Sequence, residues 1–197
     1  MLAGGASSRF GSDKALARLG GKTVLSRMCT LIENVTGSVS VVAAAGRYPD
    51  FRAMTVSDRW PGEGPLGGII TALRATAQGN GGEWNLIVSC DMPFVTREWL
   101  SHVIERTSAS DTEVIVPRSE HGLEPLCACW MTAAVDKLHG AFDEGVRKVT
   151  EAMKRLRMEV LDETHWKRFD SAGRLFWNMN TPQDYEEAVR IWRTEHE

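Results

Sequence analysis

Short apolar runs that are typical of β-strands alternate along the chain with longer segments that have the spacing of amphipathic helices. The run WNLIVSC (84–90) is almost continuously apolar, as expected of a strand that is covered on both faces. The segment TVLSRMCTLIENV (23–35) has apolar residues at i, i+3, i+4 and i+7, which is the spacing of one helix face. This alternation predicts an α/β fold with a Rossmann-like, mostly parallel sheet and helices on both faces.

The same patterns predict the remaining elements and the place of a binding site. Further strands are expected at 38–45, 54–57, 113–117, 126–130 and 174–180, and further helices at 64–77, 96–107, 132–142, 146–156 and 181–195. We expect all 197 residues to form a single domain, 1–197. Ligands of such sheets bind beyond the carboxyl ends of the strands. The loops expected to form the site are therefore 4–14, 58–67, 90–93 and 178–181.

The first strand is expected at the centre of the sheet, but only Met1, Leu2 and Ala3 precede the first loop. Strands are typically about 5–6 residues long. The sequence therefore has a shortened first strand or lacks the native beginning of that strand, and both alternatives stay open.

Charge and cysteine content limit the partners that we expect. The formal net charge is −3, so no global basic field indicates nucleic acid or a membrane surface as a partner. No apolar run approaches the roughly 18 residues of a membrane-spanning helix. The cysteines Cys29, Cys90, Cys127 and Cys129 are scattered, and we expect free thiols in a reducing cytoplasm. Cys127 and Cys129 should point the same way along a strand.

The first loop, GGASSRFGSDK (4–14), combines glycines with two cations. Glycine lets backbone N–H groups approach a ligand closely, and consecutive inward N–H groups form a concavity that binds anions. Arg9 and Lys14 add positive charges that can neutralise phosphates. The loop is not a Walker A motif, because G-x-x-x-x-G-K-[ST] is absent. A solvated turn is the alternative, but the combination favours phosphate binding.

Two carboxylates follow predicted strands. Asp91 comes directly after 84–90, where a magnesium-binding carboxylate belongs, since Mg²⁺ uses one or two carboxylates together with phosphate oxygens. Asp58 follows the strand 54–57 and precedes a glycine-rich stretch at 62–68. By position alone, each could equally be a residue of a turn.

Two asparagines stand at the end of the last predicted strand. Asn178 and Asn180 are two residues apart, so both amides would lie on one side of that strand and could face the site. Thr181 is expected to cap the last helix, with Pro182 at its first position. This capping explains Thr181 and Pro182 but not the asparagines, for which we expect a role in positioning substrate.

Four segments, in order, resemble the molybdenum cofactor guanylyltransferases, a family of α/β nucleotidyltransferases. They are LAGGASSRFGSDKAL (2–16), GPLGGI (64–69), CDMPF (90–94) and NMNTPQDY (178–185). The first is similar to the family signature L-A-G-G-x-S-x-R-M-G-x-D-K-A-L and departs from it at Phe10. A second departure is AAAGR (43–47), where the family often carries an asparagine near Ala44.

The resemblance implies a fold of the nucleotide-diphospho-sugar transferase type and the transfer of GMP from GTP to the terminal phosphate of the molybdopterin cofactor. Mg²⁺ is the implied cofactor, GTP and the molybdopterin cofactor are the implied partners, and proteins of molybdoenzyme assembly are further ones. The implied nucleotide-binding residues are Leu2, Ala3, Gly4, Gly5, Lys14, Asp58 and Asp91; catalysis is implied for Lys14, Arg9 and Asp91, metal binding for Asp91, and substrate binding for Asn178 and Asn180.

Two alternatives remain beside this interpretation. The first is a CTP-dependent molybdopterin cytidylyltransferase or another small-molecule nucleotidyltransferase; Gly5 favours GTP, because relatives that use CTP tend to have L-A-A-G. The second is a nucleotide-binding accessory protein without turnover. Only the missing asparagine near Ala44 supports this second alternative, and the presence of Lys14 and Asp91 argues against it.

Overall fold

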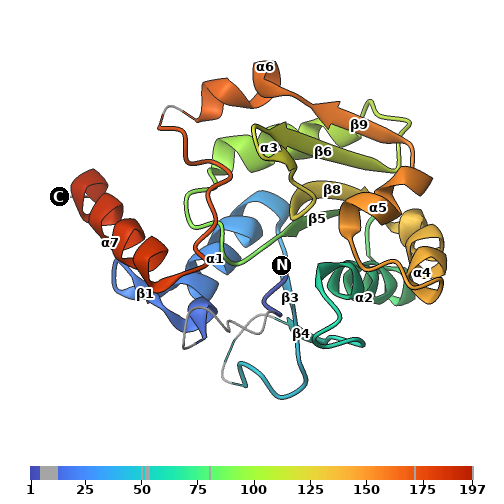
Figure 1. Cartoon of the computed structure of the whole chain (residues 1–197), viewed down its shortest axis with the longest axis horizontal. Coiled ribbons are helices and arrows are strands. Elements are labelled where there is room, and N and C mark those ends of the chain that lie inside the picture. The colour runs from blue at the N-terminus through green and yellow to red at the C-terminus, as the bar shows by residue number, and fades with distance from the viewer. Residues whose placement is uncertain (5–12, 50, 52–53, 80, 171, 197) are drawn as a thin grey trace.

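The computed structural model describes residues 1–4, 13–49, 51, 54–79, 81–170 and 172–196. Its strands form a central layer with helices on both faces, which confirms the predicted α/β architecture (Figure 1). Across this layer the order is β4 (Met54–Ser57), β3 (Ser40–Ala43), the first three residues, β5 (Trp84–Val88), β8 (Cys127–Met131), β6 (Val114–Ser119) and β9 (Met158–Leu161).

The first three residues lie at the centre of the sheet, as predicted, between β3 and β5. The amide of Leu2 donates to the carbonyl of Val88 at 2.9 Å. The amide of Ala3 donates to the carbonyl of Val42 at 2.9 Å. On the same side as Val88, the carbonyl of Leu2 accepts from the amide of Cys90 at 3.0 Å. Leu2 is therefore bridged in parallel to both neighbouring strands.

The sheet is mixed, because β8 runs antiparallel to both of its neighbours, β5 and β6. The pairs β3–β4 and β6–β9 are parallel. The connection between β6 and β8 spans residues 120–126 and is shorter than the dozen residues that a parallel crossover needs. Part of it pairs back on β6 as the short strand β7 (Gly122–Leu123).

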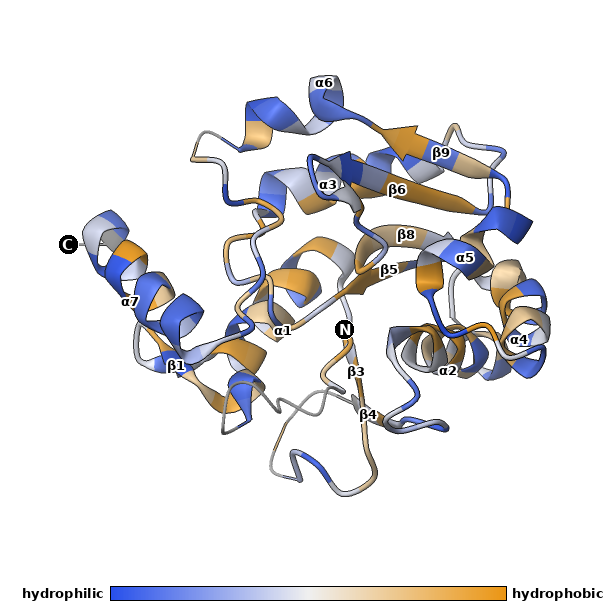
Figure 2. Cartoon of the chain, in the orientation of Figure 1, coloured by the Kyte–Doolittle hydropathy of each residue, from blue (hydrophilic) through white to orange (hydrophobic). Residues whose placement is uncertain are grey.

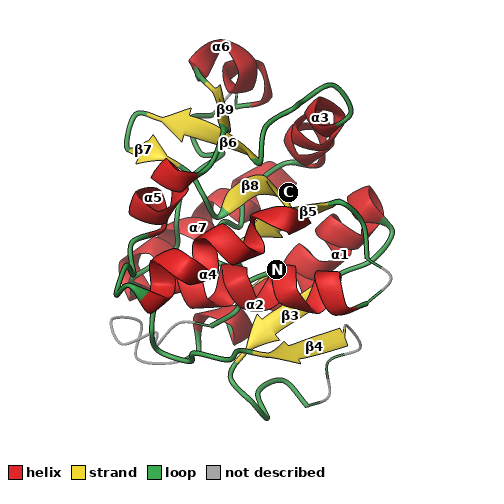
Figure 3. Ribbon diagram, turned by 90° about the vertical axis from the view of Figure 1, so that its right-hand side faces the viewer, coloured by secondary structure: helices red, strands yellow, loops and turns green. Residues whose placement is uncertain are grey.

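Each face of the sheet packs its own set of helices. One face carries α1 (Val24–Thr36) and α3 (Arg97–Thr107), and the other carries α2 (Pro65–Gln78) and α4 (Val135–Asp143). Figure 3 shows α2 and α4 side by side. The strands between the two layers are predominantly apolar (Figure 2).

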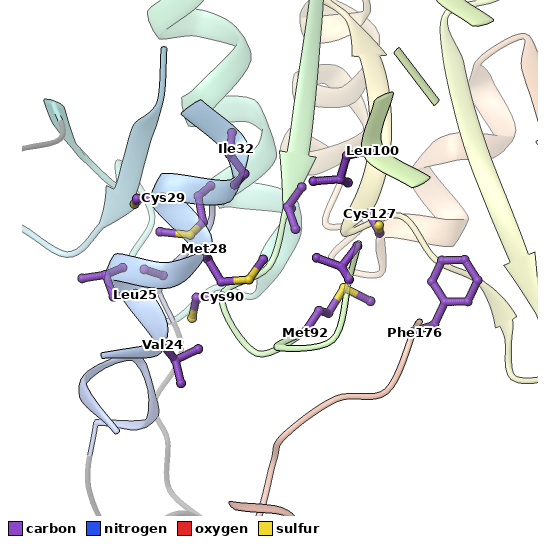
Figure 4. Packing of buried hydrophobic residues seen from close by; sticks show 14 of the residues in the cluster. Val24, Leu25, Met28, Cys29, Ile32, Cys90, Met92, Leu100, Cys127 and Phe176 are labelled. Carbon is purple, nitrogen blue, oxygen red and sulfur yellow. The ribbon is translucent and has the colours of Figure 1, made fainter. Parts of the chain in front are cut away.

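The side chains of β8 alternate between these two faces. Cys127 and Cys129 join the cluster under α1 and α3, as predicted from their spacing, whereas Ala128 and Trp130 join the cluster under α2 and α4. Figure 4 shows Cys127 among residues of the first cluster. The sheet thus separates the two hydrophobic cores, and β8 contributes side chains to both.

The remaining elements are short, apart from the last helix. They are β1 (Arg18–Leu19), β2 (Lys22–Thr23), α5 (Val149–Ala152), α6 (Glu163–Trp166), α7 (Pro182–His196) and the 3₁₀ turns η1 (Lys14–Leu16), η2 (Thr132–Ala134), η3 (Met153–Arg155) and η4 (Lys167–Phe169). The predicted helices at 132–142 and 146–156 each contain one of these 3₁₀ turns. No helix in the described part of the chain has both the length and the apolarity needed to cross a membrane.

Helix ends follow the capping residues of the sequence. The hydroxyl of Thr96 accepts from the amide of Trp99 at the start of α3. At the start of α7, the Thr181 hydroxyl accepts from the amide of Asp184, and the Asp184 carboxylate accepts from the amide of Thr181. This reciprocal arrangement is a capping box, with Pro182 as the first residue of the helix.

The prediction of a strand at 174–180 is wrong. The chain turns at Leu175 and Phe176, and the segment joins the rest mainly through burial of apolar side chains, among them Met179. A backbone hydrogen bond links the amide of Met179 to the carbonyl of Asp91 at 2.8 Å. The apolar residues that suggested a strand fill the core from a loop instead.

The hairpin of β1 and β2 turns through two adjacent glycines. Gly20 has φ +57° and Gly21 has φ +81°, as a two-residue hairpin turn of the primed type requires. A methyl group added at Gly20 would lie 2.2 Å from the indole nitrogen of Trp192 on α7. One added at Gly21 would meet nothing within 4 Å.

Gly20→Ala and Gly21→Ala therefore form a matched pair. Both incur the backbone cost of a left-handed residue, about 1–2 kcal/mol. Gly20→Ala must also displace Trp192, so we expect it to lower the free energy of unfolding by at least about 1 kcal/mol more than its neighbour does. Urea unfolding followed by circular dichroism measures both changes, and equal losses would contradict the packing of α7 on this turn.

Candidate active site

A pocket opens at the carboxyl ends of the central strands, where the sequence placed it. Three of the four predicted loops contribute to its walls, together with Val42 and Leu126. The lining residues are Leu2, Ala3, Gly4, Asp13, Lys14, Ala15, Val42, Asp58, Gly64, Pro65, Gly68, Ser89, Cys90, Asp91 and Leu126. The pocket therefore draws on residues from both sides of the central strand.

The pocket brings together most of the residues predicted to bind a nucleotide. Leu2, Ala3, Gly4, Lys14, Asp58 and Asp91 all line it. Gly5, which was also predicted to bind the nucleotide, and Arg9, which was predicted to act in catalysis, lie outside the described residues. The fourth predicted loop, 178–181, is not part of the lining and reaches the site through Asn180.

Lys14 is the centre of a three-way contact. Its ammonium nitrogen lies 2.6 Å from Oδ2 of Asp91 and 3.1 Å from Oδ1 of Asn180. The side chains of Lys14 and Asp91 are only 17% and 13% exposed, so the ion pair is shielded from much of the solvent. Segments from the beginning, middle and end of the chain thus meet at one positive charge.

The second carboxylate oxygen of Asp91 is in a different situation. Oδ1 is buried and has no hydrogen-bond partner among the described residues. A buried acceptor without a donor is costly, and a cation or a ligand donor at this position would remove that cost. The described residues contain no cluster of three or more His, Cys, Asp or Glu side chains that could hold a metal ion. One carboxylate oxygen fits Mg²⁺ when phosphate oxygens and water complete the shell.

Asp58 is held by its own loop and by α2. Oδ1 accepts from the amide of Trp60 at 3.0 Å and from the hydroxyl of Thr71 at 3.3 Å. Oδ2 faces Gly4, since a methyl group added there would lie 3.7 Å from it. One oxygen therefore fixes the side chain, and the other is presented beside the start of the first loop.

The two asparagines occupy different environments. Asn180 is exposed and accepts from Lys14, as described above. The Asn178 amide instead donates to the carbonyl of Phe176 at 3.0 Å, within its own turn. Of the two, Asn180 is the one that the structure brings to the charged centre.

Asp13 is a site residue that the sequence analysis missed. Its carboxylate caps η1 by accepting from the amide of Ala15 at 3.1 Å, and it also accepts from the Arg47 guanidinium and the Tyr48 hydroxyl. Its place directly before Lys14, ahead of a turn, was a usable signal for a cap. Arg47 and Tyr48 follow β3, and no local pattern indicated their contact with the first loop.

Comparison with known proteins agrees with this geometry. Residues 1–158 match the family model of the MobA-like NTP transferase domain. A probable molybdenum cofactor guanylyltransferase from Chloroflexus aggregans is 31% identical over 93% of this chain and 89% of its own length. A molybdenum cofactor guanylyltransferase from Desulfosudis oleivorans is 28% identical over 95% of this chain and 92% of its own.

Solved structures show the same architecture. The crystal structure of molybdopterin-guanine dinucleotide biosynthesis protein A from Archaeoglobus fulgidus superposes with a TM-score of 0.81 at 26% identity, over 98% of this chain and 97% of that one. 2-C-methyl-D-erythritol 4-phosphate cytidylyltransferase from Thermus thermophilus has a TM-score of 0.70 at 16% identity, over 98% and 96%, and shares the fold. The four ordered sequence segments, the fold and the family match lead to one conclusion: the chain belongs to the MobA-like NTP transferase family.

Proposed function

We propose that the chain is a molybdenum cofactor guanylyltransferase, which transfers GMP from GTP to the terminal phosphate of the molybdenum–molybdopterin cofactor and releases pyrophosphate. The contact of Lys14 with Asp91 and Asn180 beside the pocket is the observation that carries this proposal. The names of the relatives from Chloroflexus aggregans and Desulfosudis oleivorans support the choice of substrates.

The reaction needs little acid–base chemistry from the protein. The second pKa of a phosphate monoester is about 6, so the acceptor phosphate is largely ionised near pH 7. One of its oxygens attacks the α-phosphorus of GTP, and the bond between that phosphorus and the oxygen that bridges it to the β-phosphorus breaks, so that pyrophosphate leaves with that oxygen. The requirements are alignment of the two substrates and neutralisation of negative charge.

Lys14 is suited to the second requirement. An ammonium group has three N–H donors, and contacts with Asp91 and Asn180 use two of them. The third can donate to a phosphate oxygen of GTP. We propose that Arg9 adds positive charge from the same loop. Backbone groups of residues 2–5 would approach the nucleotide, and Oδ2 of Asp58 would accept a hydrogen bond from it.

Asp91 is suited to hold the metal ion, because Oδ1 has no donor among the described residues. When bound, Mg²⁺ supplies charge neutralisation and alignment to the phosphates. Asn180 orients the Lys14 ammonium from the acceptor side, and Asn178 supports the turn that carries Asn180. Proteins of molybdoenzyme assembly are proposed to receive the product.

We further propose that residues 1–197 act as one nucleotidyltransferase domain. α7, which follows the matched region, packs on the β1–β2 hairpin near the start of the chain, and this contact supports the proposal. The cytoplasm is the proposed compartment. Four free, buried cysteines support it, because thiols persist in a reducing environment.

Replacing Asp91 by asparagine tests the metal site. Asp91→Asn keeps the side-chain volume but removes the charge, so we expect guanylyl transfer to fall by at least about 100-fold. The melting temperature should stay close to that of the wild type. Asp111→Asn is the matched control, because Asp111 is exposed and precedes β6, which starts at the end of the strands opposite the pocket. Wild-type turnover of Asp91→Asn at saturating Mg²⁺ would rule out this assignment.

Nucleotide choice is a second test. GTP should bind more tightly than CTP or ATP when titrated calorimetrically in the presence of Mg²⁺. A site that pairs with the edge of guanine leaves polar groups unpaired with another base, at a cost of about 1–3 kcal/mol for each buried group. Equal affinities for GTP and CTP would contradict a specific guanylyltransferase. They would still be consistent with a nucleotidyltransferase that accepts more than one nucleotide.

A further inference from the structure

The hydroxyl of Tyr48 lies between the two described ends of the first loop. Its oxygen is 3.2 Å from the carbonyl oxygen of Ala3, at the end of the central strand. It is also 3.0 Å from Oδ2 and 3.2 Å from Oδ1 of Asp13. A phenol has one proton, so the hydroxyl donates to Ala3 or to Asp13 at any moment. The charged carboxylate is the stronger acceptor.

Asp13 transmits this contact to the charged centre. Its carboxylate accepts from the amide of Ala15, and its carbonyl accepts from the amide of Leu16 at 3.0 Å. These two bonds define the turn that carries Lys14. A side chain after β3 is therefore linked, through Asp13, to the position of the Lys14 ammonium.

Arg47 fixes the same carboxylate from a second direction. Its guanidinium pairs with Oδ2 of Asp13 and lies 5.4 Å from the centre of the Tyr48 ring. Neither Arg47 nor Tyr48 lines the pocket; Arg47 reaches it through Asp13, and Tyr48 reaches it through Asp13 and the carbonyl of Ala3.

The backbone of Tyr48 is strained. Its φ is +58°, and it is the one residue other than glycine with positive φ in the described part of the chain. Such a conformation costs about 1–2 kcal/mol for a residue with a side chain. It persists only where the surroundings enforce it. Here the ring packs against the first hydrophobic cluster, and the carbonyl of Tyr48 accepts from the amide of Phe51 at 3.0 Å.

The hydroxyl keeps its proton under all ordinary conditions. Burial, followed by the negative charge of Asp13, raises the pKa of Tyr48 above its usual value. The group therefore remains a donor to the carboxylate over the whole pH range in which the protein would act.

We propose that Tyr48 is a positioning residue for nucleotide binding, because its hydroxyl fixes Asp13 and thereby the turn that holds the Lys14 ammonium beside Asp91. The inference rests on the proposed function and adds a residue from outside the pocket to it. Tyr48 would touch neither the nucleotide nor the acceptor.

Tyr48→Phe removes the hydroxyl and keeps the ring, so the fold should be retained. We expect the Kd for GTP in the presence of Mg²⁺ to rise about five- to twentyfold, because part of the stabilisation from one hydrogen bond to a charged group is lost; the Arg47 pair still holds Asp13. Thr36→Val is the control, because it also removes one hydroxyl. The Thr36 hydroxyl donates to a backbone carbonyl, that of Ile32 at 2.9 Å, at the end of α1 and outside the residues that line the pocket. Its Kd should change by less than about twofold.

A double-mutant cycle separates positioning from a general structural role. If Tyr48 acts through Lys14, Tyr48→Phe should have little further effect on the Kd in a Lys14→Met background. Losses that simply multiply would overturn the inference, as would a Tyr48→Phe variant with the wild-type Kd. A wild-type chain that does not bind GTP would instead contradict the proposed function. Melting temperatures of the four proteins, measured in parallel, confirm that each is folded at the temperature of the titration.

Discussion

The backbone hydrogen bonds of the first three residues hold the two parts of the sheet together. Through Leu2 and Ala3 they join β3 on one side to the end of β5 on the other. The pocket depends on this arrangement, because Asp58 follows β4 and Asp91 follows β5, with Gly4 between them. Asp58 and Asp91, the two carboxylates that follow β4 and β5, are thus placed on either side of a short stretch of central backbone.

Around this frame, the charged centre is assembled from loops that have little regular structure. The C-terminal segment reaches Lys14 because Leu175 and Met179 are buried and the Met179 amide binds the carbonyl of Asp91. Asn180 follows directly and is thereby placed beside the ammonium group. A regular strand here would have paired with an edge of the sheet, whereas the loop allows Asn180 to reach Lys14 beside the central strands.

The parts of the fold that the sequence predicted are those with a local pattern. The helices were recognisable from periodicity and from caps such as Thr181, and Asp91 was recognisable because it follows a buried apolar run. The direction of β8 and the looped course of 174–180 depend on connection length and on distant packing, which an apolar pattern does not encode. The contact of Tyr48 with Asp13 joins residues 35 positions apart and leaves no trace in either segment. The roles of Gly5 and Arg9 stay predictions from the residues of the first loop and from the resemblance.

The burial of all four cysteines makes the native chain nearly inert to alkylating reagents. Burial raises the pKa of the Cys29 thiol to about 11 and that of Cys90 to about 12. At pH 8 only about one Cys29 side chain in a thousand would be a thiolate, which is the reactive form. Reaction with a bulky reagent therefore has to wait for local opening. Cys29 lies on α1, Cys90 lines the pocket and Cys127 lies on β8. The order in which these cysteines are alkylated would therefore show which of these regions opens first.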